Sequence, residues 1–515
     1  MSIRRFLKSG RLVGLASFLG WSLVFGVIYA QSPLYTSNQN LYFLHGLAQA
    51  GFGYLRNDWL AGRPEFMPVF TWLVAGTYLL FHSKLPFYLY YALLMGVYLY
   101  GMYGIMDLLF DLRRSKARAL LFLVLFLAVH SAAMRYLLSR VINADATFLL
   151  EGGVANQRLL GQVFQPSVFG VLLILSLYLF MKKRPFWSLV PLAAAIYLHP
   201  VYLLAGALLT IAYMWVLFRE RRGLKAPLRL GIVSLLLVLP VLVYTILLYA
   251  APSPAVAAQA LDILVNFRNP HHALVWAWLN WTVAVQSVIL VAGLFLTRRT
   301  RLFPILLIVT VGTVALTILQ VVTASNWLAL IFPWRVSVIL VPTGTTILLA
   351  FGVTKLMDAW KASPKAEAGL TVAALVLVAG LIFVGGSRFQ IESARQQSDP
   401  ARPMMDFVAA HKSPGDLYLI PTKMDDFRLA TGAPVFVDFN ATPDRDADVL
   451  VWYRRLQVAD WFYGGAPNPC QALSQMAADY GITYAVVETD NAFTRCTSLP
   501  TPYEDAAYKI YKLTP

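Results

Sequence analysis

The chain has 515 residues, of which 58% are hydrophobic and 13% are charged, and its mean hydropathy is +0.62. Soluble globular domains are about one quarter charged, so this composition excludes an ordinary soluble protein and indicates a polytopic membrane protein. The net charge of +16 is unevenly distributed, because residues 387–515 hold 12 of the 42 Lys and Arg but 16 of the 26 Asp and Glu. The other basic residues form short clusters between apolar runs, a pattern typical of cytoplasmic turns, and we predict no nucleic-acid partner.

Apolar runs of roughly 18–22 residues predict about 11 transmembrane helices within residues 1–386. The first run, 12–30, follows a basic N-terminus and has no small-residue cleavage site, so we expect an anchor with a cytoplasmic N-terminus. All later basic turns share the cytoplasmic side if an odd number of crossings lies between residues 31 and 112. Either one of the runs 65–82 and 86–111 is re-entrant, or the stretch 41–55 also crosses. The basic turns lie at 113–116, 182–184, 219–229, 298–299 and 355–365.

The predicted topology collects scarce acidic residues on the extracytoplasmic face. A long first external loop, 31–64, contains an apolar stripe at 41–55, which predicts either a helix lying in the membrane interface or an amphipathic surface helix. The stripe is followed by Asn57-Asp58-Trp59. The acidic residues of the membrane part that fall on this face are Asp58, Glu65, Asp145, Glu151 and Asp262.

The second external loop, 139–163, is unusually polar for a segment between two apolar runs. It contains Asp145, Glu151, Gln157 and Arg158, together with a Gly-Gly pair at 152–153. Carboxylates beside a bilayer are costly to desolvate and often mark functional sites. A solvated loop and a functional site are the two interpretations that fit.

Further candidates lie in three other external turns. His199, before Pro200, is either a hydrogen-bonded turn residue or part of a cavity lining. Arg268 precedes the pair His271-His272, which fits a metal site, a phosphate site or a polar helix end; we expect adjacent histidines to point apart. Arg335 either extends to the membrane interface or binds a lipid phosphate through its guanidinium.

The C-terminal part has a different character. Residues 387–401 are predicted to be a linker and residues 402–515 a small extracytoplasmic α/β domain. Cys470 and Cys496 favour a disulfide over two free thiols. The expected strands are 416–420, 434–438, 482–487 and an edge strand at 507–512, and the expected helices are 446–463 and 471–480.

As a whole the chain resembles the GT-C superfamily of membrane glycosyltransferases, which take a sugar from a polyprenyl-phosphate donor. The matching features are a long first external loop with Asp58, acidic residues in the second loop (Asp145 and Glu151), and a soluble α/β domain after the last span. The segments 426–429, 268–272 and 333–335 are also similar to those of an uncharacterised bacterial family of polytopic proteins. The membrane part of the chain, residues 1–386, has no Asp-x-Asp pair, so the need for a divalent metal stays open.

The resemblance implies transfer of a sugar from a polyprenyl-phosphate-linked donor to an acceptor on the outer face of the bacterial inner membrane. It implies that Asp58 is the base and that Asp145 or Glu151 orients the acceptor or binds a metal. The remaining implied substrate-binding residues are Gln157, Arg158, His199, Arg268, His271, His272 and Arg335. The alternatives are a lipid or lipid-linked-glycan transporter or flippase, a non-enzymatic scaffold, and an O-antigen polymerase or ligase. The sequence predicts no oligomeric state.

Overall fold

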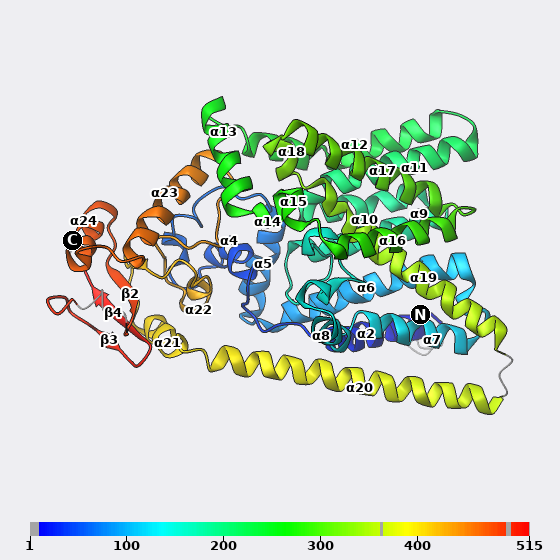
Figure 1. The fold of residues 1–515 in the computed structure, drawn as a ribbon, viewed down its shortest axis with the longest axis horizontal. Coiled ribbons are helices and arrows are strands. Elements are labelled where there is room, and N and C mark those ends of the chain that lie inside the picture. The colour runs from blue at the N-terminus through cyan, green and yellow to red at the C-terminus, as the bar shows by residue number, and fades with distance from the viewer. Residues whose placement is uncertain (1–9, 361–363, 491–495, 514–515) are drawn as a thin grey trace, which may run out of the picture. The chain divides into compact units, whose positions relative to one another are not determined.

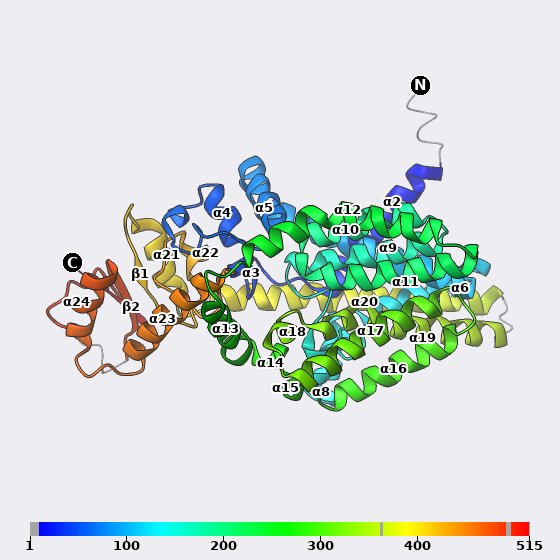
Figure 2. The same ribbon diagram turned by 90° about the horizontal axis from the view of Figure 1, so that it is seen from above.

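A computed structural model describes residues 10–360, 364–490 and 496–513, so the basic residues at 4–8 lie outside the described residues. The chain forms two compact units, each made of separated segments (Figures 1 and 2). Unit 1 comprises Met1–Gln31, Phe87–Val243 and Val265–Gln390, and unit 2 comprises Ser32–Pro86, Tyr244–Leu264 and Ile391–Pro515. This division differs from the predicted boundaries at residues 386 and 402, because residues 32–86 fold with the C-terminal part.

Unit 1 is a bundle of apolar helices. Among the described residues, six helices are long and apolar enough to cross a membrane, and α7 and α8, bent by 55°, make a seventh if they form one span. The same part of the chain has five shorter apolar helices, four in unit 1 and one, Pro68–Phe81, in unit 2, so the protein is a multi-pass membrane protein. The helices are α2 (Gly10–Tyr29), α6 (Leu85–Phe110), α7 (Lys116–Val129), α8 (Ala132–Val141), α9 (Val171–Met181), α10 (Pro185–Leu198), α11 (Leu203–Arg221), α12 (Lys225–Leu248), α14 (Pro270–Ala273), α15 (Val275–Trp278), α16 (Trp281–Thr297), α17 (Leu302–Thr323), α18 (Asn326–Leu330), α19 (Ser337–Ala359) and α20 (Pro364–Gln397).

Helix lengths bear on the ambiguous region between residues 31 and 112. Helix α6 has 26 residues, and at about 1.5 Å per residue it exceeds the roughly 30 Å of a hydrocarbon core. Helix α5 (Pro68–Phe81) has only 14 residues and falls short of that thickness. One crossing by α6, with α5 not spanning, gives the odd number that the topology requires.

The basic turns of unit 1 lie together at one end of the bundle, on the right in Figure 1. Arg301 pairs with Glu220 at 2.9 Å and donates from Nη1 to the Phe180 carbonyl at 2.7 Å. Arg118 forms an ion pair with Asp358. These contacts join turns that are far apart in the sequence, as the topology predicted. Which side of the membrane this end faces stays a prediction.

Unit 2 contains a mixed four-stranded sheet with helices packed around it. The strand order is β1-β2-β4-β3, with β1 and β2 parallel and the other neighbours antiparallel. The strands are β1 (Tyr418–Leu419), β2 (Tyr484–Glu488), β3 (Tyr503–Glu504) and β4 (Tyr508–Lys512). The helices are α3 (Gln39–Tyr42), α4 (Leu44–Gln49), α5, α13 (Pro254–Asp262), α21 (Arg402–His411), α22 (Phe427–Thr431), α23 (Asp446–Tyr463) and α24 (Pro469–Tyr480).

Several expectations for the C-terminal part are confirmed and others are wrong. Helix α23 has the predicted bounds, and Cys470 and Cys496 are bridged with their Cα atoms 5.4 Å apart. Strand β4 is not an edge strand, because it pairs with both β2 and β3. The expected strand at 434–438 makes only a single bridge, from Val435 to Tyr418. The predicted linker is helical as far as Gln397, because α20 continues through it.

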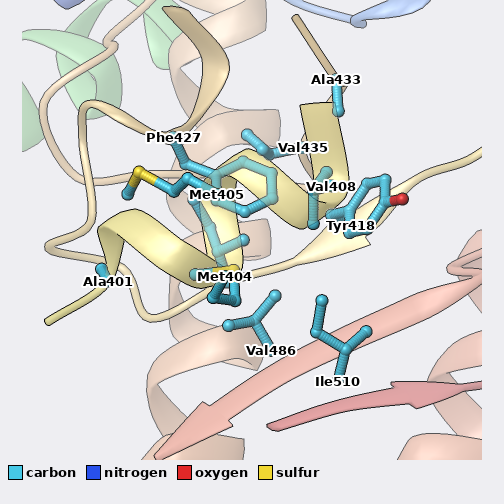
Figure 3. Packing of buried hydrophobic residues seen from close by; sticks show 11 residues of the cluster. Ala401, Met404, Met405, Val408, Tyr418, Phe427, Ala433, Val435, Val486 and Ile510 are labelled. Atoms are coloured by element: carbon cyan, nitrogen blue, oxygen red, sulfur yellow. The ribbon is translucent and has the colours of Figure 1, made fainter. Parts of the chain in front are cut away.

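Helix α21 covers the sheet with one apolar face (Figure 3). Met404 and Val408, four residues apart and therefore on the same side of the helix, are buried against Val486 and Ile510 of the sheet. Tyr418 of β1 belongs to the same buried cluster. This core gives unit 2 its own hydrophobic centre.

The first loop does not form the continuous interfacial helix expected at 41–55. Instead α3 and α4 are short, and five of the six residues of α4 are buried. A Cβ atom on Gly46 would lie 2.6 Å from Val74 Cβ, so α4 packs closely on α5. Gly51 and Gly53 then take positive φ angles of 78° and 52°, which end the helical path.

Candidate functional site

The Gly152–Gly153 turn anchors the second loop on helix α19. Ser337 Oγ accepts a hydrogen bond from Val154 N at 2.9 Å, and Gly153 N donates to the Gln157 carbonyl at 2.7 Å. A Cβ atom on Gly153 would lie 2.6 Å from Val338 N, so glycine is needed here for close packing. The pair therefore serves to hold residues 154–158 against the start of α19.

The next two residues have an unusual backbone. Ala155 and Asn156 both adopt left-handed conformations, with φ angles of 58° and 55°. Asparagine tolerates this region, whereas alanine is strained in it. Strained backbone often occurs at functional sites. This turn places Gln157 and Arg158 immediately after it.

Glu151 forms a buried ion pair with a residue that the sequence analysis missed. Arg135 of α8 donates from Nη1 to Glu151 Oε1 at 3.2 Å, and it also donates to the carbonyls of His130 and Tyr29. Glu151 Oε2, in contrast, has no hydrogen-bond partner among the described residues. Burial raises the pKa of Glu151 to about 7, although the positive charge of Arg135 opposes the shift.

Arg158 lies next to this pair with its guanidinium 3.8 Å from the centre of the Phe148 ring. Burial lowers the pKa of Arg158, and the negative charge of Glu151 acts against that effect. A guanidinium keeps its charge in proteins, so Arg158 is a half-buried cation beside a single carboxylate that Arg135 already partly neutralises. The surroundings thus carry excess positive charge.

Gln157 links the second loop to the start of α19. Arg335 donates from Nε to Gln157 Oε1 at 2.9 Å, while Gln157 Nε2 has no partner among the described residues. Arg335 also lines a small, partly open cavity between the start of α11 and the α18–α19 segment. The other lining side chains are apolar apart from Tyr202. Arg335 is therefore a cation on the wall of an apolar cavity.

His271 and His272 meet, contrary to our expectation that adjacent histidines point apart. Their ring centres are 4.2 Å apart, because α14 is a single short turn that starts at Pro270. Burial, followed by the nearby charges of His271, Arg335 and Arg158, lowers the pKa of His272 to about 3. His272 is therefore neutral at physiological pH.

The remaining candidate residues of unit 1 are His199, Arg268 and Asp145. His199 is buried, and Arg335 is near enough for its charge to act on the imidazole. Arg268 is half-buried at the end of the π-helical segment Ile263–Arg268, and it donates to Asn269 Oδ1 at 3.5 Å. Asp145 is exposed in the short helix Ala144–Phe148.

Asp58 belongs to unit 2, where it is 1% exposed and pairs with Arg428. Its Oδ1 accepts from Leu60 N at 3.0 Å, and its Oδ2 accepts from Arg428 Nε at 2.7 Å and from Val435 N at 3.0 Å. Both carboxylate oxygens are thus engaged within the protein. This geometry is that of a structural ion pair.

Unit 1 thus holds six residues that we call the polar cluster. Three of them lie in the second loop, and the other three lie in three separate segments. Among the described residues, no group of three or more His, Cys, Asp or Glu side chains is arranged to hold a metal. Sequence reasoning missed Arg135, yet an arginine inside the apolar run 119–138 is the kind of residue that normally requires a partner. The members of the polar cluster are Arg135, Glu151, Gln157, Arg158, His272 and Arg335.

Comparisons with known proteins give limited information about this multi-pass protein. A domain family of unknown function, DUF6798, matches residues 399–459. No curated protein matches the chain significantly. Among solved structures, the chain is similar to ArnT from Cupriavidus metallidurans bound to undecaprenyl phosphate, with 13% identity over 96% of this chain and 97% of that chain and a TM-score of 0.46. At this level the likeness assigns neither an activity nor site residues.

Proposed function

We propose that the protein is a membrane glycosyltransferase of the GT-C type, which uses a polyprenyl-phosphate-linked sugar on the outer face of the bacterial inner membrane. The observation that carries the proposal is the position of Arg335. Its side chain lines an otherwise apolar cavity and is bonded to Gln157 of the polar cluster. A cation between an apolar cavity and a polar cluster fits a phosphate attached to a hydrocarbon chain.

The charge balance of the cluster supports an anionic ligand. Arg135 forms an ion pair with Glu151. Among the described residues, neither Arg158 nor Arg335 forms an ion pair with a carboxylate. Guanidinium groups bind phosphate oxygens through parallel hydrogen bonds. When the bond between sugar and phosphate breaks, negative charge develops on the leaving phosphate, and these two half-buried arginines stabilise it.

Glu151 is the group best suited to accept the proton of the acceptor hydroxyl. One of its oxygens is unpartnered, and its raised pKa of about 7 matches a general base at physiological pH. The acceptor oxygen forms a bond to the anomeric carbon, the bond to the phosphate oxygen breaks, and the hydroxyl proton passes to Glu151. The sequence analysis gave this role first to Asp58, whose oxygens are both engaged in unit 2.

The test is transfer of radiolabelled sugar from a polyprenyl-phosphate donor by the purified protein, with Glu151→Gln as the main variant. We expect Glu151→Gln to lower turnover by roughly 10²–10⁴-fold, the usual contribution of a general base. Asp145→Asn is the matched control, because Asp145 is an exposed carboxylate of the same loop, and it should retain turnover. Normal turnover in Glu151→Gln removes that residue from the role. Tight lipid binding by the wild type without any transfer would indicate a carrier or flippase instead.

A further inference from the structure

Two buried tryptophans lie beside the polar cluster, and the proposed sugar transfer gives them no role. Trp278 of α15 and Trp334, next to Arg335, pack with ring centres 5.1 Å apart, and only 8% and 2% of their surfaces are exposed. Ala155 of the strained turn belongs to the same cluster. The pair therefore packs against the segment that presents Gln157 and Arg158.

Both indole N–H groups lack a hydrogen-bond acceptor among the described residues. Buried tryptophans usually satisfy this group, since an unpaired buried donor is costly. Trp452 in unit 2, which is completely buried, donates to the Asp438 carbonyl at 2.9 Å. Trp278 and Trp334 thus hold two unpaired donors side by side, against Ala155 of the strained turn.

Three unpaired N–H donors lie beside the polar cluster, together with one unpaired carboxylate oxygen, Glu151 Oε2. Besides the two indoles, the Gln157 Nε2 amide is buried and unpaired. No carboxylate accompanies them apart from Glu151, one oxygen of which is bonded to Arg135. These three donors bind acceptor oxygens of a ligand. A protonated amine, in contrast, would face an excess of positive charge, because Arg135, Arg158 and Arg335 outnumber the single carboxylate of Glu151.

We propose that Trp278, Trp334 and Gln157 form the sugar-binding part of the site, and that they select a neutral or acidic sugar over an amino sugar. This inference rests on the proposed function and specifies the donor that it uses. The indole and amide donors bind hydroxyl or carboxylate oxygens of the sugar. Arg335, which is bonded to Gln157, also lines the apolar cavity. Aromatic side chains also provide flat apolar surfaces for sugar rings.

The experiment compares binding of four lipids to the full-length protein in lipid nanodiscs. The probes are undecaprenyl phosphate and its conjugates with glucose, glucuronic acid and glucosamine. We expect the wild type to bind the glucose or glucuronic acid conjugate about tenfold more tightly than the glucosamine conjugate. A preference for the glucosamine conjugate, or equal binding of all four lipids, would overturn the inference.

The variants Trp278→Phe and Trp334→Phe keep the aromatic ring and remove the N–H group. Each should weaken binding of the preferred conjugate by roughly three- to tenfold, the effect of one hydrogen bond, without changing the affinity for undecaprenyl phosphate. Trp276→Phe and Trp327→Phe are the controls, since these tryptophans are 75% and 61% exposed. If the variants weaken binding of undecaprenyl phosphate as much as binding of the preferred conjugate, the tryptophans are structural and the inference fails.

A second variant does not depend on the aromatic core. Gln157→Glu keeps an oxygen for Arg335 and replaces the amide donor with an acceptor, so it should shift preference toward the glucosamine conjugate. An unchanged order of preference contradicts the inference while leaving the proposed function intact. If the wild type binds none of the four lipids, the proposed function itself fails, and the inference fails with it.

Discussion

Each unit of this protein buries a carboxylate against an arginine, and the two arrangements differ in how completely they are satisfied. In unit 2, Arg428 pairs with both Asp58 and Asp438. Asp438 Oδ1 also accepts from Ala441 N at 2.6 Å. In unit 1, Glu151 uses one oxygen for Arg135, and its other oxygen has no partner among the described residues.

The difference shows that burial of a charged residue is a weak indicator of function by itself. Asp58 is more deeply buried than Glu151, yet its bonds tie the first loop to residues 428–435 and hold unit 2 together. Glu151 is bonded through Oε1 only, which leaves Oε2 without a partner among the described residues. A buried polar atom without a partner is therefore the better criterion.

The largest expected effect is on the unit 2 network. Arg428→Ala leaves two buried carboxylates without their counter-ion, and breaking such a network costs about 3–5 kcal/mol. Chemical unfolding monitored by intrinsic fluorescence should show this loss of stability. Arg454→Ala, at an exposed position of α23, is the control and should change stability by less than about 0.5 kcal/mol. Equal stability of the two variants would contradict a structural role for the network.

Arg335 offers a corresponding test in unit 1, where binding rather than folding should suffer. Arg335→Ala should weaken binding of undecaprenyl phosphate by roughly 10–100-fold, since a hydrogen bond to a charged group contributes about 1.5–3 kcal/mol. Arg140→Ala, at an exposed arginine of α8, is the matched control for a change of net charge. If both variants lose affinity equally, the attraction is a general surface effect and not a site.

The pH dependence of turnover tests the role proposed for Glu151. Glu151 has a pKa raised to about 7, so it is mostly protonated at pH 6 and mostly ionised at pH 8. Turnover that needs the ionised base should rise through pH 7 and then level off. Because the pKa in the folded protein is raised above its ordinary value, the stability that this group contributes is lost as the pH rises through 7. A pH profile flat between 6 and 8 would contradict the assignment of Glu151 as base.

The smallest expected effect concerns the strained turn beside Glu151. Ala155→Gly should stabilise unit 1 or leave it unchanged, by about 0–1 kcal/mol, since glycine adopts a φ angle of 58° without strain. Ala146→Gly is the control: Ala146 is equally small and buried, but its φ angle is not positive, so this variant should destabilise. Thermal unfolding of both variants checks the prediction, and a clear loss in Ala155→Gly would contradict it.

Local patterns predicted those parts of the molecule that depend on neighbouring residues. Composition gave the membrane class, and the apolar periodicity of residues 446–463 predicted α23 with its observed bounds. Scarcity of charge drew attention to Glu151, Gln157 and Arg158, which the structure brings together with Arg335 and His272. The same reasoning failed for 41–55, where close packing of Gly46 on α5 replaced the expected interfacial helix.

By itself, then, the sequence determined the membrane class and the basic turns, favoured the disulfide, and indicated the loop that carries half of the polar cluster. Only the tertiary structure decided which charges are neutralised within the protein. Asp58 and Arg428 are 370 positions apart, and no periodicity or spacing records such a pair. The partners of Arg135 and of the two tryptophans are likewise not visible in the sequence, where Arg135 is part of an apolar run. Their importance depends on which polar atoms lack a partner once the chain has folded, and a hydrogen bond is a property of three-dimensional proximity.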